Sequence, residues 1–549
     1  MKTKNFITVC FMLLTLAVSG WAQGESDLSA TQSLATLPVQ SGGRLKPLDT
    51  LARESVRLVT GKVQFEKQEP VVTLLSWWAD PELEKREIIE FRDLEAKKEL
   101  GLDPDQRWYS FAELAENQSL DKWRQEIHQH QQNDEELHGP EEKIQDLLIK
   151  MSVVGRIKNG SIFQVVPNPS GMEETWGSFA DFEHEGLIEL VIPAKNAVDQ
   201  LRQAIVSGDE AAILAAAGSV RSELSKLGPV PEETIMAREL RYNKSHPFRK
   251  AWILYLVGLA ILTFSQPKTQ TMAYRAGCGF ILAGFVMHIY GFALRCLIAG
   301  RPPVTNMYES VIWVAFGAVL FALIFEYISP RRYYLMSAAA GAVVCLVLAD
   351  TLPTVLDPSI NPLTPVLRSN FWLTIHVLSI TLGYAAFLLA LGLGHMVLWK
   401  SALRPQQEEV IAGLHDALYR ALQVGVLLLA AGTILGGVWA NYSWGRFWGW
   451  DPKEVWALIA LLGYLAILHG RHAGWIRKFG IAAWSVIAFQ GVLMAWYGVN
   501  YVLGAGLHSY GFGSGGVEYV GVYVVAEILF VLWATHKHRS HLRPVEAKQ

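Results

Sequence analysis

Two patterns of apolar and polar residues divide the chain. After residue 247, long apolar segments alternate with short polar ones, and each is near the length of about 20 residues that a helix needs to cross a bilayer. The segments are Phe248–Gln266, Met272–Ile298, Ser310–Phe325, Tyr334–Ala349, Leu373–Leu398, Leu422–Ala440, Pro452–His469, Phe479–Val499 and Val520–Trp533. The pattern predicts a polytopic α-helical membrane protein, with about nine transmembrane helices over residues 248–535.

Residues 23–247 contain both helix-like runs and short strand-like segments. This combination predicts a soluble domain of mixed α/β structure. A polar stretch, Asp121–Glu142, is typical of a solvated helix or a flexible arm. The tryptophans of this domain are predicted to pack in its core. The predicted helices are Ile144–Met151, Asn196–Ile205 and Ala211–Leu227, and the predicted strands are Ser161–Val166 and Ile188–Ile192.

The first 22 residues have the layout of a secretory signal. Lys2 and Lys4 precede an apolar run that ends at Val18, and Gly20 and Ala22 supply the small residues of a cleavage site. The leader is either cleaved after Ala22 or retained as an anchor. In both cases we expect residues 23–247 to be exported.

Charge is distributed unevenly between the two parts. Residues 25–245 carry 25 basic and 39 acidic side chains, whereas residues 246–549 carry 21 and 12. An acidic soluble domain argues against nucleic-acid binding. Alternate links between the apolar segments are basic, as is the tail at 536–549, so the positive-inside rule places them in the cytoplasm. We therefore expect a protein of the bacterial inner membrane, with residues 439–454 on the periplasmic face.

Residues 439–454 read WANYSWGRFWGWDPKE and carry the most distinctive chemistry. Aromatic faces on a backbone loosened by glycine suit a large, flat, apolar ligand, although an interfacial aromatic belt is the alternative. Asp451-Pro452, with Glu454 two residues later, predicts a capping box at the start of the next helix. We therefore expect a tryptophan-rich loop between two membrane helices.

The segment WGRFWGWDPKE resembles the WWD signature of haem-handling proteins in cytochrome c assembly. Over residues 248–535 the chain is similar to the CcsA (ResC) family, the membrane half of the system II cytochrome c synthase. The resemblance implies that non-covalent b-type haem crosses the membrane and is presented to the CxxCH thiols of apocytochrome c. It implies a CcsB (ResB)-like partner and thiol-reducing proteins. The chain would be the haem-presenting subunit of a holocytochrome c synthase, with no catalytic acid or base identified.

Histidines supply the candidate iron ligands. His376 and His508 fall on the same side of the predicted membrane as the tryptophan-rich loop, and two imidazoles are a common way to hold haem iron. The contexts FWLTIHV and GLHSYG resemble those of the external ligands of the family. His469, in YLAILHGR, resembles the ligand of a second haem within the membrane, whose opposing ligand would come from the partner. His395 is an alternative ligand, and His288 is expected to be a polar packing residue.

The remaining haem contacts are assigned to the tryptophan-rich loop by the same resemblance. Arg446 there and Arg301 elsewhere either pair with haem propionates or are solvated. Asn306 and Glu309 are expected to cap the third helix. Glu527 lies within the ninth helix, where a carboxylate in the membrane costs free energy and is often functional. The predicted contacts in the loop are Trp439, Trp444, Gly445, Arg446, Trp448, Trp450 and Asp451.

Two other functions fit parts of the pattern. A haem exporter or chaperone of system I, similar to CcmC or CcmF, would share the tryptophan signature and leave the attachment chemistry to other proteins. A respiratory b-type cytochrome is the more distant alternative. None of the four cysteines lies in a C-x-x-C motif, so neither a thioredoxin-like site nor covalent c-type haem is encoded in this chain.

Overall fold

The computed structural model describes residues 30–133, 137, 139–168, 174–184, 188–265, 271–353, 355–362, 370–504 and 516–542. The chain forms two compact units, an N-terminal unit of residues 23–245 and a membrane unit that begins at His246. His246 has a positive φ of 42°, and Pro247 then starts the first helix of the membrane unit. The leader, residues 1–22, lies outside the described residues.

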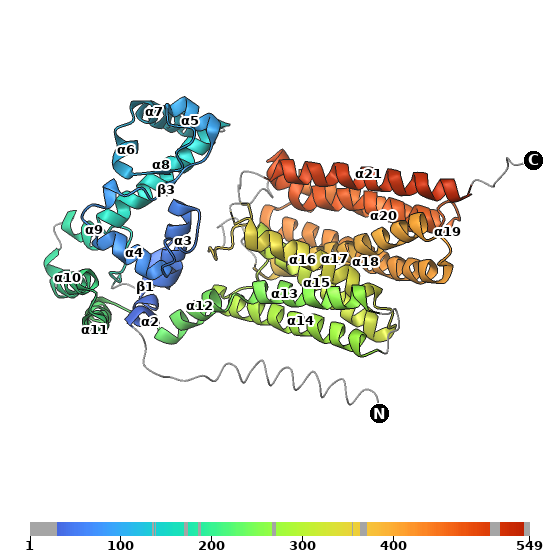
Figure 1. Ribbon diagram of the computed structural model, residues 1–549, viewed down its shortest axis with the longest axis horizontal. Coiled ribbons are helices and arrows are strands. Elements are labelled where there is room, and N and C mark those ends of the chain that lie inside the picture. The colour runs from blue at the N-terminus through green and yellow to red at the C-terminus, as the bar shows by residue number, and fades with distance from the viewer. Residues whose placement is uncertain are drawn as a thin grey trace, which may run out of the picture. The chain divides into compact units, whose positions relative to one another are not determined.

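The N-terminal unit is mostly helical, with two small antiparallel sheets, β1–β2 and β3–β4 (Figure 1). Trp77 and Trp176 are fully buried in its core as predicted, whereas Trp108 and Trp123 are only half-buried. Its elements are α2 (Ala30–Ala35), β1 (Pro38–Ser41), β2 (Arg44–Pro47), α3 (Leu48–Thr60), α4 (Pro70–Ala79), η1 (Leu83–Lys85), β3 (Ile89–Glu90), α5 (Leu94–Leu100), β4 (Trp108–Tyr109), α6 (Phe111–Ala115), α7 (Gln118–Gln132), α8 (Pro140–Lys158), α9 (Phe179–His184), η2 (Ile188–Val191), α10 (Ile192–Ser207), α11 (Glu210–Leu227) and α12 (Glu233–Ser245).

Both predicted strands of this unit are wrong. Residues 161–166 make only isolated bridges, from Gln164 to Gln40 and from Val166 to Gly177. Residues 188–191 form the short helix η2, which runs directly into α10. Pro193 explains the second error, because proline in the first turn of a helix fixes a helical φ and donates no hydrogen bond. The apolar residues there pack as a helix start.

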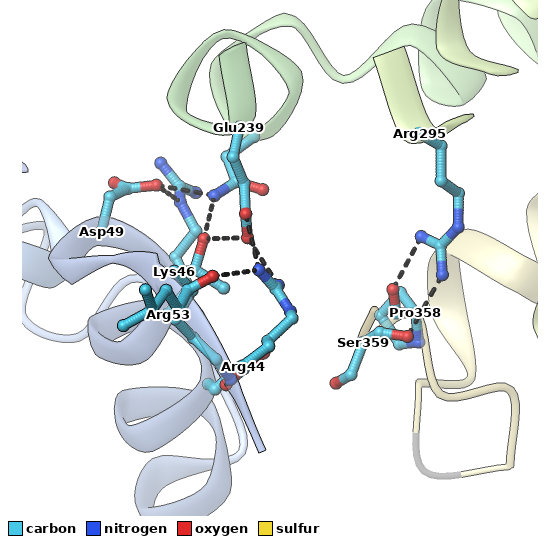
Figure 2. A network of polar contacts seen from close by, with 12 residues as sticks. Arg44, Lys46, Asp49, Arg53, Glu239, Arg295, Pro358 and Ser359 are labelled. Atoms are coloured by element: carbon cyan, nitrogen blue, oxygen red, sulfur yellow. Dashed lines mark hydrogen bonds and ion pairs between the residues drawn. The ribbon is translucent and has the colours of Figure 1, made fainter. Parts of the chain in front are cut away.

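Ion pairs fasten the last helix of the N-terminal unit to its first sheet. Arg44 of β2 donates two hydrogen bonds to Glu239 of α12, at 2.7 and 2.8 Å, and Thr50 donates to the same carboxylate (Figure 2). Glu90 of β3 has a similar position, between Arg92 and Arg107. Burial alone would raise the pKa of the Glu90 carboxyl, but the hydrogen bonds from the two arginines bring it below its ordinary value.

The membrane unit confirms the polytopic helical prediction. In the described part of the chain, nine helices are long and apolar enough to cross a membrane. They run side by side in one bundle (Figure 1). They are α13 (Pro247–Phe264), α14 (Met272–Ala299), α15 (Met307–Ile328), α16 (Tyr333–Thr351), α17 (Asn370–Leu403), α18 (Glu408–Trp444), α19 (Pro452–His472), α20 (Lys478–Leu493) with its π-helical extension η3 (Met494–Leu503), and α21 (Val517–Leu542).

Helix α17 is central in this bundle, because it packs against α15, α16, α18, α20 and α21. Glycines let α17 and α18 approach closely, as small residues do between membrane helices. A Cβ at Gly432 would lie 2.7 Å from the backbone of Ile380, and one at Gly425 would lie 2.5 Å from the ring of Phe387. Phe387 in turn stacks on Tyr464 of α19, with ring centroids 3.8 Å apart. Helix α17 thus holds a fixed position relative to α18 and α19.

A buried ion pair orders one end of the bundle. Arg295 of α14 and Glu309 of α15 are fully buried, and Arg295 Nε donates to Glu309 at 2.9 Å. The guanidinium also donates to the carbonyl oxygens of Pro358 and Ser359 (Figure 2). Asn306 caps α15 as predicted, by accepting from the backbone N–H of Glu309. We call this end, which carries residues 300–306 and 445–451, the tryptophan end.

Candidate functional site

The tryptophan-rich stretch is shorter as a loop than the sequence predicted. Helix α18 continues through Trp444, so Trp439 and Trp444 are helical, and the non-helical link covers only residues 445–451. Gly445 ends the helix with a left-handed φ of 73°, which glycine adopts without steric cost. The predicted loop 439–454 is therefore a helix end, a seven-residue link and the first turn of α19.

The predicted capping box is confirmed, and it holds the link in place. Asp451 accepts from the backbone N–H of Lys453 at 3.0 Å, and Glu454 accepts from the backbone N–H groups of Asp451 and Gly449. Arg446 Nη1 lies 3.4 Å from Glu454 Oε1, so the two side chains form an ion pair. These bonds fix the link despite the positive φ of 57° at Trp450, a strained value for a bulky residue.

A cavity of about 170 Å³ lies at the tryptophan end. Five helical elements of the membrane unit contribute to its walls, together with residues just before α15 and two residues of the 445–451 link. Most of the lining is apolar or aromatic, with a few polar groups, the combination typical of ligand sites. The residues that matter below are Thr305, Asn306, Ser310, His376, Gly436, Trp439, Phe447, Trp448, Lys453, Glu454, Trp496 and Asn500.

His376 of α17 lines this cavity and is half-buried. Its ring lies parallel to that of Trp439, at 9° with centroids 6.3 Å apart. Its Nδ1 lies 2.8 Å from the carbonyl oxygen of Gly432. Because a carbonyl only accepts, Nδ1 carries the proton, and the lone pair of the neutral ring is on Nε2. Imidazoles that ligate metals are commonly oriented by a hydrogen bond of this kind.

The residues of 439–454 that were predicted to contact haem do not all line the cavity. Trp439 and Trp448 line the cavity, and Trp444 packs edge-on against Trp439 with centroids 4.6 Å apart. Trp450 is 71% exposed. Gly445, Arg446 and Asp451 build the link, and the Arg446 guanidinium lies over the ring of Trp444. Only two of the four tryptophans therefore face the cavity.

Arg301 does not line the cavity. Its guanidinium donates to Thr305, to Glu309 and to the carbonyl oxygen of Asn361. Through these hydrogen bonds Arg301 connects residues 300–306 with residues 355–362. Pairing of Arg301 with a propionate remains a prediction.

Sequence reasoning missed several cavity residues, which come from three separate elements. Trp496 and Asn500 lie on η3, and Trp496 Nε1 donates to Ser310 Oγ at 2.8 Å. Lys453 lies in the first turn of α19 and donates to Asn500 Oδ1 at 2.9 Å. The one available signal for η3 was its run of aromatic residues, which does not reveal a π-helix. Such helices are rare and are frequent at functional sites.

The other predicted histidines fall outside this cavity. His508 lies outside the described residues. His469 is exposed near the end of α19, and its Nδ1 donates to the carbonyl oxygen of Leu465 at 2.7 Å. Its Nε2 therefore carries the lone pair, on a surface that a partner could reach.

His288 and His395 are engaged in packing. His288 is fully buried, with Nε2 donating to Ile312 and Nδ1 accepting from Tyr255. His395 Nδ1 donates to Leu391, and its Nε2 lies 2.8 Å from Glu527 of α21. The bond to Glu527 occupies the nitrogen that an iron would need, which argues against His395 as a ligand.

Comparisons with known proteins agree with the fold. A family model described as cytochrome C assembly protein matches residues 304–508. The chain is 36% identical to cytochrome c biogenesis protein CcsA of Synechococcus sp. (strain CC9902) over 295 residues, which are 48% of this chain and 94% of that protein. It belongs to the CcsA family of cytochrome c assembly proteins. CcsA of Chlorella vulgaris is 32% identical, over 41% of this chain and 84% of that protein.

The family likeness extends beyond the membrane unit. Protein NrfI of Wolinella succinogenes is 29% identical over 521 residues, which are 90% of this chain. A match of this length includes much of the N-terminal unit, in addition to residues 248–535, to which the CcsA resemblance was assigned from the sequence. The chain spans 55% of the length of NrfI. The family assigns the chain to cytochrome c assembly, which involves haem and apocytochrome c.

Proposed function

We propose that this member of the CcsA family binds haem non-covalently at the tryptophan end and presents it for attachment to the CxxCH thiols of apocytochrome c. The protein would receive haem from the membrane and act with a CcsB-like partner. Each thiol adds across a vinyl group, so one C–S bond forms, the thiol hydrogen moves to carbon, and no oxidant is consumed. The contribution of the chain would then be binding and orientation.

His376 carries the proposal. It lies in an aromatic cavity, and its hydrogen bond to Gly432 leaves the lone pair of the neutral ring on Nε2, the state that ligates iron. Trp439 and Trp448 supply apolar faces of the kind that a porphyrin contacts. The chemistry of these residues suits a haem. We propose His508 as the second external ligand from its sequence context.

We further propose that His469 ligates a second haem together with an imidazole of the partner. Its exposed position on α19 supports this, because its Nε2 lies on a surface that a partner could reach. A ligand supplied by another chain would complete the site. The basic links support a periplasmic location for the tryptophan end, at the inner membrane, and the leader would direct the acidic N-terminal unit to the periplasm.

A reporter cytochrome provides the test. We would express the chain with a CxxCH reporter in cells that lack their own assembly proteins, with and without a CcsB-like protein, and score covalent haem on the reporter. The proposal predicts attachment only when both membrane proteins are present, and its loss in His376→Ala. A His288→Asn variant is the matched control, because His288 does not line the cavity.

The system I alternative predicts a different outcome of the same experiment. A haem exporter or chaperone would accumulate haem without modifying the reporter in the presence of a CcsB-like protein. Co-purification would then recover a haem chaperone. Equal amounts of covalent haem on the reporter in cells with and without this chain would contradict both functions.

A further inference from the structure

Lys453 has an unusual position for a cation. It is the second residue of α19, where the backbone N–H groups make the helix end electropositive. A basic side chain there is disfavoured by the helix dipole, since acidic residues are the ones that stabilise this end. The side chain nevertheless lines the cavity and is half-buried. The cavity thus combines an ammonium group with a helix N-terminus.

The Asp451 carboxylate attracts the Lys453 ammonium electrostatically, and its side-chain oxygen accepts from the backbone N–H of Lys453. Lys453 Nζ donates to the Asn500 side-chain oxygen at 2.9 Å, which uses one of its three donors. The nearest acidic residue of the lining, Glu454, directs its carboxylate to the backbone N–H groups of Gly449 and Asp451. Among the residues that the structure describes, no carboxylate oxygen forms an ion pair with Lys453 Nζ. The wall formed by Lys453 and Asn500 is therefore suited to an anion.

Other residues of the same lining have a different chemistry. His376, Trp439 and Trp448 offer an imidazole lone pair and apolar aromatic faces. A ligand that satisfies both sets of residues needs a flat apolar body and a carboxylate at its edge. Haem is such a molecule, because its propionates project from one edge of the ring.

We propose that Lys453, oriented by Asn500, binds a propionate carboxylate of the haem whose iron His376 would ligate. This inference rests on the proposed function and assigns a carboxylate subsite to the same cavity. The Nζ of Lys453 has donors left for a charge-assisted hydrogen bond, which is stronger than a neutral one. Arg301 and Arg446 are directed to other partners, so Lys453 is the cationic side chain of the described cavity lining.

The competing interpretation is structural: Lys453 would only connect α19 to η3 through Asn500. The two roles differ in their dependence on the carboxylate of the ligand. A structural role affects every ligand of the cavity equally. A propionate-binding role affects haem and leaves its dimethyl ester, which has no carboxylate, unaffected.

Titrations of purified protein in detergent separate the two roles. Haem and haem dimethyl ester would be titrated into wild type, Lys453→Met, Lys453→Arg and Lys478→Met, with visible absorbance as the readout. Lys478, at the start of α20, is exposed and lies at the opposite end of that helix from the cavity, so it is the matched control. We expect wild type and Lys478→Met to bind haem about tenfold to a hundredfold more tightly than the ester.

Lys453→Met should lose this preference while its affinity for the ester is unchanged, and Lys453→Arg should keep most of it. A Lys453→Met protein that retains the preference, or that loses affinity for both ligands equally, would overturn the assignment. If wild type binds haem with a spectrum that depends on His376 but shows no preference, only the Lys453 proposal fails. If wild type shows no such spectrum, the proposed function fails as well.

Discussion

The contact between Gly436 and His376 allows the site to be perturbed without removing any chemical group. Gly436 lies on α18 beside the imidazole of α17. A Cβ added there would be 2.6 Å from Cε1 and 2.8 Å from Nδ1 of His376. The ring would have to retreat by about 0.8 Å to reach the 3.4 Å of ordinary contact. That movement would also disturb the hydrogen bond from Nδ1 to Gly432.

We therefore predict that Gly436→Ala lowers haem affinity by about 10- to 100-fold, the usual effect of disturbing the groups that orient a metal ligand. The assay is a haem titration of purified protein, with thermal unfolding measured in parallel. Gly463→Ala on α19 is the control, because a Cβ there meets no atom within 4 Å. Alanine favours a helix over glycine, so neither variant should unfold earlier through helix propensity. Unchanged haem affinity in Gly436→Ala would refute the placement of His376.

Three further predictions concern ion pairs. Arg295→Met should destabilise the membrane unit by up to about 3 to 5 kcal/mol, because it removes the closer of the two arginines that pair with the fully buried carboxylate of Glu309; an unchanged thermal midpoint would contradict this. Glu527→Leu should lower the midpoint, and the double variant with His395→Leu should recover most of the loss, with the haem spectrum unaltered in both. Glu90 has a lowered pKa, so its stabilisation is present above about pH 4.5 and lost as the pH falls through the folded value. In the full chain, the Glu90→Gln variant should therefore lose less stability than wild type as the pH is lowered below about 4.5, as measured by unfolding at a series of pH values.

The membrane helices could be predicted from sequence because lipid imposes a simple rule. A spanning segment must satisfy its own backbone and present apolar side chains, so a run of suitable length is strong evidence. The capping box was also predictable, since Asp451, Pro452 and Glu454 act within one helical turn. Each of these features depends on residues that are close together in the chain.

The rest of the site depends on contacts between distant segments. Lys453, Trp496 and Asn500 meet Ser310 and His376 only because α15, α17, α19 and η3 converge, and no local pattern reports that convergence. The predicted end of α18, Ala440, is four residues too early, because the aromatic residues that follow it were assigned to a loop. A glycine within a helix is tolerated where packing requires it, and a Cβ at Gly437 would lie 2.6 Å from the ring of Phe447.

Ligation of haem iron by His376 is the central claim, and magnetic circular dichroism of the purified haem-loaded protein tests it most directly. The account predicts a histidine-ligated spectrum in wild type, its loss in His376→Ala, and its recovery when imidazole is added to that variant, because the added ring would occupy the space left beside Trp439. A His376→Ala protein with the wild-type spectrum and no response to imidazole would contradict the account.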